Sequence, residues 1–318
     1  MNKRPLGKTG MHASEISLGT WAFASQVYGD VSEAAAHEAV AAALEAGINF
    51  FDTAPLYGTA TAIGTAEEIL GRALGKRRDD VLISTKFGRY STDASPNFHA
   101  QRARESVEGS LKRLGTDRID VLFFHSPFSA AEIHDDVWGE LAKLKAEGKV
   151  RAIGHSISMF QDTQAMAREW AADGRIDCIQ VVLSLMNRES LELIRDVSRL
   201  GCGVVARESL GNGFLTGAIT KDTVFPANNL NSRYTREQIA ERVDYVDSLK
   251  FLVRGDITTL PQAAMRWCLD QEGVTTVLTG AKNPAEVLDC AAASNAAPYS
   301  AEELARAKAL HGKDYSAA

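Results

Sequence analysis

The sequence predicts an α/β fold in which eight parallel strands close into a (β/α)8 TIM barrel. Three observations support this. Short apolar runs alternate with helical patterns along the 318-residue chain, there are eight such runs, and the units recur at a spacing of roughly 30 residues. The apolar runs are nearly continuous, which is typical of parallel strands because both faces of their sheet are buried. We therefore expect one barrel domain over residues 1–318.

The competing architecture is a doubly wound open sheet. That fold usually carries a G-x-G-x-x-G segment after its first strand, and no such segment follows the first apolar run here. The chain is also long enough for a barrel of about 250 residues with additions. The additions that we expect are an N-terminal hairpin and extra C-terminal helices.

The first half of the chain contains four strand and helix units. A hairpin in the opening segment precedes a strand from Glu15 to Leu18, and Ser32 caps a helix that Gly47 ends. The strands and helices predicted next, in order, are a strand at 48–52, a helix at 65–74, a strand at 81–86, a helix at 99–114 closed by Gly115, and a strand at 119–125.

The alternation continues through the second half. The predicted elements are a helix at 135–147, a strand at 150–155, a helix at about 160–172, a strand at 178–182, a helix at 190–200 and a strand at 203–207. Residues 211–235 show little apolar pattern. After them we expect helices near 236–253 and 260–270, a strand at 274–280, a helix from Pro284 and a last helix from Ser300.

Composition excludes several classes of partner. The net charge is −6 and no basic stripe is visible, so neither nucleic acid nor an anionic membrane is expected to bind. The N-terminus lacks the apolar region of a secretory signal, and no apolar run approaches the ~20 residues of a membrane span. The four cysteines form no CxxC pair and no cluster with zinc-ligand spacing, so we expect free thiols, no metal and a cytoplasmic location.

Four polar residues stand at the ends of neighbouring strands. Asp52 ends the second strand, Tyr57 follows in the loop beyond it, and Lys86 and His125 end the third and fourth strands. Active sites of barrels lie at the carboxyl ends of the strands, so these side chains can converge on one point. Each residue taken singly is better explained by capping, packing or strand termination. Their joint occurrence on adjacent strands favours a catalytic site.

The four residues suit proton transfer to a carbonyl oxygen. A free tyrosine has a pKa near ~10, too high for ready donation at neutral pH. A nearby ammonium from Lys86 lowers that pKa, and Asp52 can pair with the ammonium. His125 can hydrogen-bond a substrate oxygen. We expect Tyr57 to exchange the proton while another group delivers hydride.

These segments resemble the aldo-keto reductase superfamily over almost the whole chain. DTAPLYG at 52–58 is similar to its Asp/Tyr signature, STKFG at 84–88 to its lysine strand, and LFFHSP at 122–127 to its histidine strand. The resemblance implies that Tyr57 is the general acid, that Lys86 and Asp52 tune it, and that His125 orients the substrate. It also implies a nicotinamide cofactor held across the barrel mouth, which accounts for the missing glycine fingerprint.

The same resemblance implies a cofactor-binding set with some departures from the family pattern. Ser156 and Gln180 match residues that hold the carboxamide, although Ile157 replaces an expected Asn, and Arg207 stands where many members have an aromatic ring. The full predicted set is Gly19, Thr20, Trp21, Asp52, Ser156, Gln180, Arg207, Leu210, Gly211, Gly213, Leu215, Gly280, Lys282, Glu286, Asp289 and Cys290.

The predicted activity is an NAD(P)H-dependent interconversion of carbonyls (aldehydes, ketones or sugar hemiacetals) and alcohols. The alternatives are a sugar dehydrogenase that works mainly towards oxidation and a cofactor-binding regulatory protein with little turnover. Lys282 favours NADP slightly over NAD, and Glu286 opposes it. Trp21, Tyr57, Phe87 and His125 are the predicted substrate contacts, and Phe128 and Phe225 are further candidates. The role of His155 is open between substrate contact and structural hydrogen bonding, and the sequence does not indicate an oligomeric state.

Overall fold

A computed structural model describes residues 1–24, 29, 31–59, 61–93 and 95–315 and confirms the predicted barrel. The strands close in the order β10-β3-β4-β5-β6-β7-β8-β9, and all their pairings are parallel. Their bounds are β3 Ile16–Gly19, β4 Phe50–Asp52, β5 Leu82–Phe87, β6 Ile119–His125, β7 Val150–Ser156, β8 Cys178–Val182, β9 Gly203–Arg207 and β10 Thr276–Thr279.

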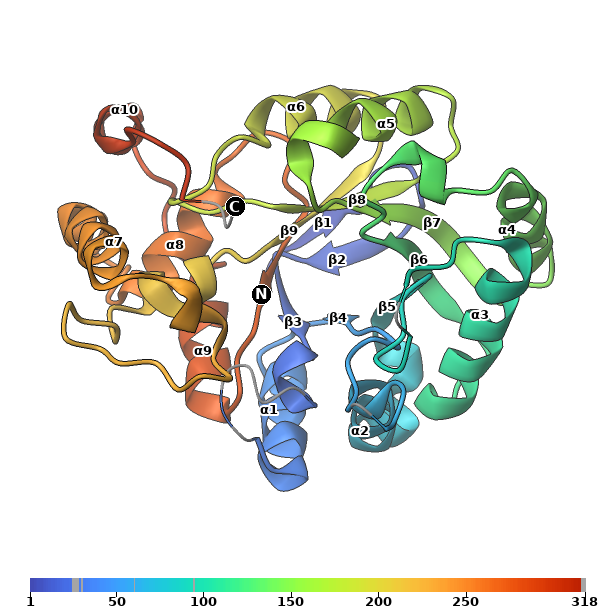
Figure 1. The fold of residues 1–318 in the computed structure, drawn as a ribbon. Helices are drawn as coiled ribbons and strands as arrows, with labels where there is room; N and C mark the ends of the chain where they lie inside the picture. The colour runs from blue at the N-terminus through green and yellow to red at the C-terminus, as the bar shows by residue number, and fades with distance from the viewer. Residues whose placement is uncertain (25–28, 30, 60, 94, 316–318) are drawn as a thin grey trace.

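Helices surround the barrel on its outside (Figure 1). The helices that follow the eight strands are α1 Glu33–Glu45, α2 Thr65–Leu74, α3 Ala100–Leu114, α4 Asp136–Ala146, α5 Phe160–Ala172, α6 Leu191–Arg199, α8 Leu260–Leu269 and α9 Pro284–Ala292. The expected C-terminal addition is present as α10 Ala301–Leu310, and α7 Arg236–Ser248 is a further helix between β9 and β10. Ser32 caps α1 by accepting a hydrogen bond from the Ala35 amide, and Gly115 ends α3 with a φ of 64°.

The predicted N-terminal hairpin consists of β1, Lys3–Pro5, and β2, His12–Ser14. Its Leu6, Met11 and Ala13 side chains are buried together with side chains that fill the barrel, among them Phe50 and Phe123. The hairpin therefore closes the barrel at the amino-terminal ends of the strands. The opposite end, where the polar residues stand, stays free of it.

Alternation along each strand separates two kinds of side chain. On β5, Ser84 and Lys86 face the barrel interior, whereas Thr85 bonds the Glu67 carboxylate of α2 and Phe87 packs against Phe98. Every residue of β5 and β6 is buried, so both faces of the sheet are covered. The polar residues of the site lie inside the barrel because they occupy the alternate strand positions whose side chains point inward.

Several boundaries differ from the prediction, most of them by one or two residues, among them β10, which spans Thr276–Thr279 rather than 274–280, and two differences have a visible cause. The strand expected at 48–52 begins at Phe50, because Asn49 exchanges hydrogen bonds with Ser14 of the hairpin. The helix expected near 236–253 ends at Ser248, whose hydroxyl donates to the Tyr245 carbonyl, and a 3-10 turn, Lys250–Leu252, follows. The patternless segment 211–235 contains two 3-10 turns, Gly211–Thr216 and Leu230–Arg233.

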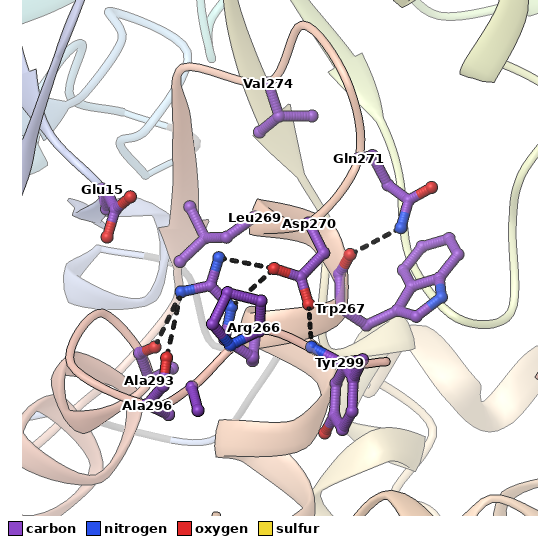
Figure 2. A network of polar contacts seen from close by, with 12 residues as sticks. Glu15, Arg266, Trp267, Leu269, Asp270, Gln271, Val274, Ala293, Ala296 and Tyr299 are labelled. Carbon is purple, nitrogen blue, oxygen red and sulfur yellow. Dashed lines mark hydrogen bonds and ion pairs between the residues drawn. The ribbon is translucent and has the colours of Figure 1, made fainter. Parts of the chain in front are cut away.

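A buried ion pair ties the C-terminal segment to the barrel (Figure 2). The Arg266 guanidinium of α8 lies 2.7 Å from the Asp270 carboxylate, and both side chains are about 5% exposed. Arg266 also donates to the carbonyls of Ala293 and Ala296, and Asp270 accepts the Tyr299 amide at 2.8 Å. Burial raises the pKa of Asp270, so its charge depends on these partners.

Substitution of Arg266 by Met tests this pair. The variant leaves Asp270 buried without its cation, and we expect the free energy of unfolding to fall by about 3 kcal/mol. Urea denaturation measures the change. A matched control is Lys250→Met, whose partner is Asp247 in an exposed pair, and we expect a change of at most ~0.5 kcal/mol. Equal effects of the two variants would show that the buried pair is not structural.

Candidate active site

The predicted polar residues meet at the carboxyl ends of β4, β5 and β6. The Lys86 ammonium lies at their centre and is 1% exposed. Its Nζ donates to Asp52 Oδ2 at 2.7 Å, to the Thr53 carbonyl at 2.9 Å and to Tyr57 Oη at 3.1 Å. An ammonium has three donors, so all three are used. One of them is directed at the phenol.

The Asp52 carboxylate is fixed by side chains from two other strands, β5 and β8. Oδ1 accepts hydrogen bonds from Ser84 Oγ at 2.7 Å and from Gln180 Nε2 at 2.8 Å, while Oδ2 accepts from Lys86. Asp52 and Ser84 are register partners between β4 and β5, and Gln180 reaches them from β8. The Thr20 amide and hydroxyl donate to the Asp52 carbonyl. Neither the carboxylate nor the strand end has freedom to move away from Lys86.

The Tyr57 ring packs among three side chains. Its centroid lies 5.9 Å from the His125 ring at 86°, 6.2 Å from the Trp21 ring, and 4.7 Å from Lys86 Nζ. The loop that carries Tyr57 is tight, because a Cβ on Gly58 would come within 2.1 Å of the Ala62 carbonyl oxygen. The sequence therefore needs glycine there to place the phenol over the barrel.

The pKa of Tyr57 differs from the expectation. Burial raises the pKa of the phenol, the Lys86 ammonium lowers it and the Asp52 carboxylate raises it, so that the net direction is upward. Lys86 lowers the pKa of the phenol, as predicted, but burial has the larger effect and the net pKa lies above its ordinary value. The lysine limits the increase. Burial opposes the charge of Lys86, but Asp52 and Tyr57 together raise the pKa of its ammonium.

His125 is a buried, neutral imidazole. Burial and the cations Lys86, Arg89 and Arg207 hold its pKa well below the ordinary 6.5. Its Nδ1 is buried and has no hydrogen-bond partner among the described residues. A neutral ring carries one donor and one acceptor nitrogen, so His125 can offer a hydrogen bond without carrying charge.

Several predicted cofactor residues lie beside the Asp52 carboxylate or at the ends of the following strands. Ser156 Oγ donates to Gln180 Oε1 at 3.2 Å. Arg207, at the end of β9, donates to the Ile157 carbonyl and to Ser158 Oγ, and its buried Nε has no partner in the described part of the chain. The positive charge of Arg207 lowers the pKa of both Tyr57 and His125. A planar cation and a serine-amide pair next to the phenol fit the ring and carboxamide of a nicotinamide.

The loop after β9 contains three consecutive residues in the left-handed region. Gly211, Asn212 and Gly213 have φ values of 55°, 53° and 94°, and a Cβ on Gly213 would find only Ile219 within 4 Å. Such a run of left-handed residues turns the backbone sharply and leaves room for a phosphate to approach it closely. Leu210 is partly buried against the core and Leu215 is fully buried, so both anchor the loop.

The segment after β10 forms a capped helix start. The Glu286 carboxylate accepts the Lys282 amide at 2.9 Å and the Asn283 side chain at 2.9 Å. A Cβ on Gly280 would meet nothing within 4 Å. Asp289 accepts hydrogen bonds from Thr259 and Gln262 of the α8 start, and Cys290 is buried against Thr279. The last two side chains are therefore directed into the fold.

Two candidates for substrate contact lie outside the barrel mouth. Phe87 is fully buried between Phe98 and Phe124 in the layer between sheet and helices. His155 is fully buried against Trp170, neither of its nitrogens has a partner among the described residues, and burial lowers its pKa to about 3. Both side chains point out of the barrel from their strands, away from the mouth, so neither is placed for substrate contact. The structural hydrogen bond considered for His155 is not seen either, because neither ring nitrogen has a partner among the described residues.

Sequence reasoning missed Ser84, the Thr53 carbonyl and Arg89. Ser84 stands two residues before Lys86 on β5, so strand alternation by itself places it inward and could have identified it. Arg89 and the Thr53 carbonyl gave no comparable signal, because their partners belong to the loops and strand ends around them. In the described ranges no His, Cys, Asp and Glu side chains gather as a metal site, and no helix is long and apolar enough to span a membrane.

The titration of Tyr57 tests the electrostatics independently of turnover. Because burial raises its pKa, we expect the midpoint of the difference in tyrosinate absorbance between the wild type and Tyr57→Phe to lie above the ordinary value of ~10. Removing the cation in Lys86→Met should move the transition to still higher pH. A tyrosinate signal from Tyr57 near pH 8 would contradict the assignment of desolvation as the larger effect.

Comparisons with known proteins agree with this geometry. The profile of the Aldo/keto reductase family matches residues 15–311. The chain is 33% identical over 296 residues to the aldo-keto reductase YhdN of Bacillus subtilis, covering 90% of this chain and 87% of the relative. It is 33% identical over 319 residues to the NADH-specific methylglyoxal reductase of Escherichia coli, covering 93% and 94%.

Among solved structures, the glycerol dehydrogenase AKR11B4 of Gluconobacter oxydans superposes with a TM-score of 0.81 at 28% identity. The match covers 97% of this chain and 94% of the other. The family profile spans nearly the whole barrel, including the strand ends at which Asp52, Tyr57, Lys86 and His125 meet. This chain belongs to the aldo/keto reductase family and is an NAD(P)-dependent oxidoreductase that interconverts carbonyls and alcohols.

Proposed function

We propose that Tyr57 donates the proton in carbonyl reduction and that Lys86, Asp52 and His125 prepare it for this step. The observation that supports the proposal most strongly is the hydrogen bond between Lys86 Nζ and Tyr57 Oη, made while the same ammonium is anchored on Asp52. As the substrate oxygen gains negative charge, the phenol gives up its proton, and the fixed ammonium stabilises the phenolate that remains. A bound nicotinamide supplies or accepts the hydride.

His125 has the complementary role in this proposal. Its low pKa keeps the ring neutral at neutral pH, so it does not compete with Tyr57 as an acid. The neutral ring stands at 86° to the phenol and can donate one hydrogen bond to the substrate oxygen. This orients the carbonyl so that its oxygen faces Tyr57.

The raised pKa of Tyr57 supports reduction as the preferred direction at neutral pH. A phenol that keeps its proton can act as an acid, whereas oxidation of an alcohol needs the phenolate as base. Oxidation should therefore gain rate as pH rises. A predominantly oxidative sugar dehydrogenase and a regulatory protein with little turnover are the alternatives.

Small polar carbonyl compounds are the proposed substrates. Relatives of similar length are named for methylglyoxal reduction and glycerol oxidation, which are reactions of three-carbon compounds. The aromatic side chain that lies beside the phenol, Trp21, offers one flat apolar wall for such a substrate. We propose an aldehyde or ketone of this size class rather than an extended apolar ligand.

Either NAD or NADP fits the family, and we propose a slight preference for NADP. Lys282 supplies a cationic side chain in the segment after β10. Glu286 opposes a 2′-phosphate by charge, but its carboxylate is engaged by the Lys282 amide and the Asn283 side chain. These two hydrogen bonds direct Glu286 towards the loop backbone, which weakens its effect on the phosphate without removing it.

Tyr57→Phe tests the proton donor. The ring and its packing remain while the hydroxyl is lost, so we expect kcat for reduction of methylglyoxal or another small aldehyde to fall by at least ~100-fold. Cofactor affinity, measured by quenching of intrinsic fluorescence, should stay within about twofold, since that hydroxyl is not a proposed cofactor contact. A variant that retains most of its turnover would show that another group donates the proton. A wild type that binds cofactor but reduces no member of an aldehyde panel would favour the regulatory alternative.

Glu286→Gln tests cofactor selection. The change removes one negative charge beside Lys282 and keeps the side-chain length, so the ratio of kcat/KM for NADPH over NADH should rise by roughly tenfold. Glu272→Gln is the matched control, because Glu272 precedes β10 at the opposite end of the barrel. An unchanged ratio in Glu286→Gln would show that this carboxylate does not face the cofactor.

A further inference from the structure

Arg89 lies just beyond the end of β5 and holds the end of the neighbouring strand β6. Its Nε donates to the His125 carbonyl at 2.9 Å, and its Nη2 donates to the Ser126 carbonyl at 2.9 Å. A guanidinium presents these donors in a rigid plane, so two successive carbonyls are held in one geometry. The clamp acts on the backbone of the residue that carries the imidazole.

The rest of the loop after β6 closes around the same guanidinium. The Phe128 ring stacks on Arg89 with the guanidinium carbon 4.1 Å from the ring centroid. Glu132 lies 3.9 Å from Arg89 and accepts the Phe128 amide at 2.9 Å. The Arg89 side chain is 18% exposed, so solvent screens these contacts only in part.

The segment that Arg89 holds is conformationally unfavourable by itself. Ser126 has a φ of 53°, which is rare for a residue with a side chain, and its amide donates to the Phe124 carbonyl in a tight turn centred on His125. Such a backbone persists only where surrounding contacts determine it. The two hydrogen bonds from Arg89 are placed at this turn.

The imidazole depends on its backbone for orientation. Nδ1 of His125 is buried without a partner, and no hydrogen bond to the ring occurs within the described ranges. Metal-free histidines of active sites are commonly oriented through a hydrogen bond at the second nitrogen. Here the contact with the Tyr57 ring and the position of the main chain remain to orient it.

We propose that Arg89 is a positioning residue that holds the His125 imidazole against the phenol by fixing the carbonyls of His125 and Ser126. The proposal rests on the role of His125 proposed above and extends it to a residue that does not touch the substrate. Arg89 does so through two hydrogen bonds to the turn and through the stacked Phe128 ring.

Arg89→Ala tests the proposal kinetically. We expect kcat for aldehyde reduction to fall by about tenfold to 100-fold, because small misplacements of a catalytic group have effects of this size. The dissociation constant for NAD(P)H should change by less than about twofold. Added guanidinium or methylguanidinium at millimolar concentration should restore part of the rate.

Arg89→Lys and Arg102→Ala are the matched variants. Arg89→Lys keeps the charge but offers a point donor in place of the planar fork, so its kcat should lie between the wild type and Arg89→Ala. Arg102 likewise stacks on an aromatic ring, Tyr90, and pairs with a carboxylate, Asp93, and it makes no hydrogen bond to β6 in the described part of the chain. Its alanine variant should retain wild-type kcat. If Arg89→Ala fails to fold, Arg89→Lys takes its place.

A double-mutant cycle with His125 separates positioning from general stability. When His125 is already replaced by Ala, the further change Arg89→Ala should reduce kcat by less than about twofold, because the group that it positions is absent. Additive losses in the double variant, or a wild-type kcat in Arg89→Ala, would overturn the proposal.

The histidine ring itself provides a readout that needs no turnover. The chain has seven histidines, and their imidazole protons can be followed by NMR spectroscopy. The resonances of His125 are assigned as those that are lost in His125→Gln. In Arg89→Ala they should shift or broaden, while those of His155 stay in place. Unchanged His125 resonances would overturn the positioning role, whatever the activity towards the aldehyde panel. If no aldehyde is reduced but the resonances shift, the result contradicts the proposed function and leaves the positioning role standing.

Discussion

The buried pair of Asp52 and Lys86 is the interaction on which the rest of the site depends. Removing two charges from water costs several kcal/mol per ion, and such a pair persists only when other hydrogen bonds satisfy both groups. Ser84 and Gln180 donate hydrogen bonds to the carboxylate. The ammonium donates to the Thr53 carbonyl and to the Tyr57 hydroxyl. These partners come from β5, β8 and the segment after β4. Closure of the barrel is therefore a condition for burying the pair, and the buried pair in turn fixes the phenol.

The two ends of the barrel have different roles: the amino-terminal end stabilises the fold, and the carboxyl end carries the candidate active site. At the amino-terminal end, the hairpin fills the barrel with apolar side chains, and Arg4 joins it to the carbonyls of Leu269 and Val274 at 3.0 and 2.8 Å. At the carboxyl end, charged and polar groups are held by partners on several strands and loops. A barrel permits this division because all parallel strands present the same end to one side.

The strand and helix order was predictable from apolar periodicity and glycine placement. The helix over residues 65–74 agrees with the prediction at both ends, as do the strands over 119–125 and 178–182. The start of β4 was not predictable, because Asn49 is drawn to Ser14 of a hairpin that lies 35 residues earlier. Strand boundaries depend on such distant partners, whereas the local apolar pattern indicates only that a segment tends to form a strand.

The sequence identified the four central residues of the candidate site, whereas their electrostatics depend on the tertiary structure. Residue type and position at consecutive strand ends identified Asp52, Tyr57, Lys86 and His125, since strand alternation and parallel topology place them together. The sequence by itself could not give the direction of the Tyr57 pKa, because that direction is a balance between burial and two opposite charges a few ångströms away. It also could not connect Arg89 to the backbone of β6. Strand alternation alone would have separated Phe87 from Lys86, which are adjacent on β5. Desolvation and contacts between distant strands arise only when the chain closes on itself.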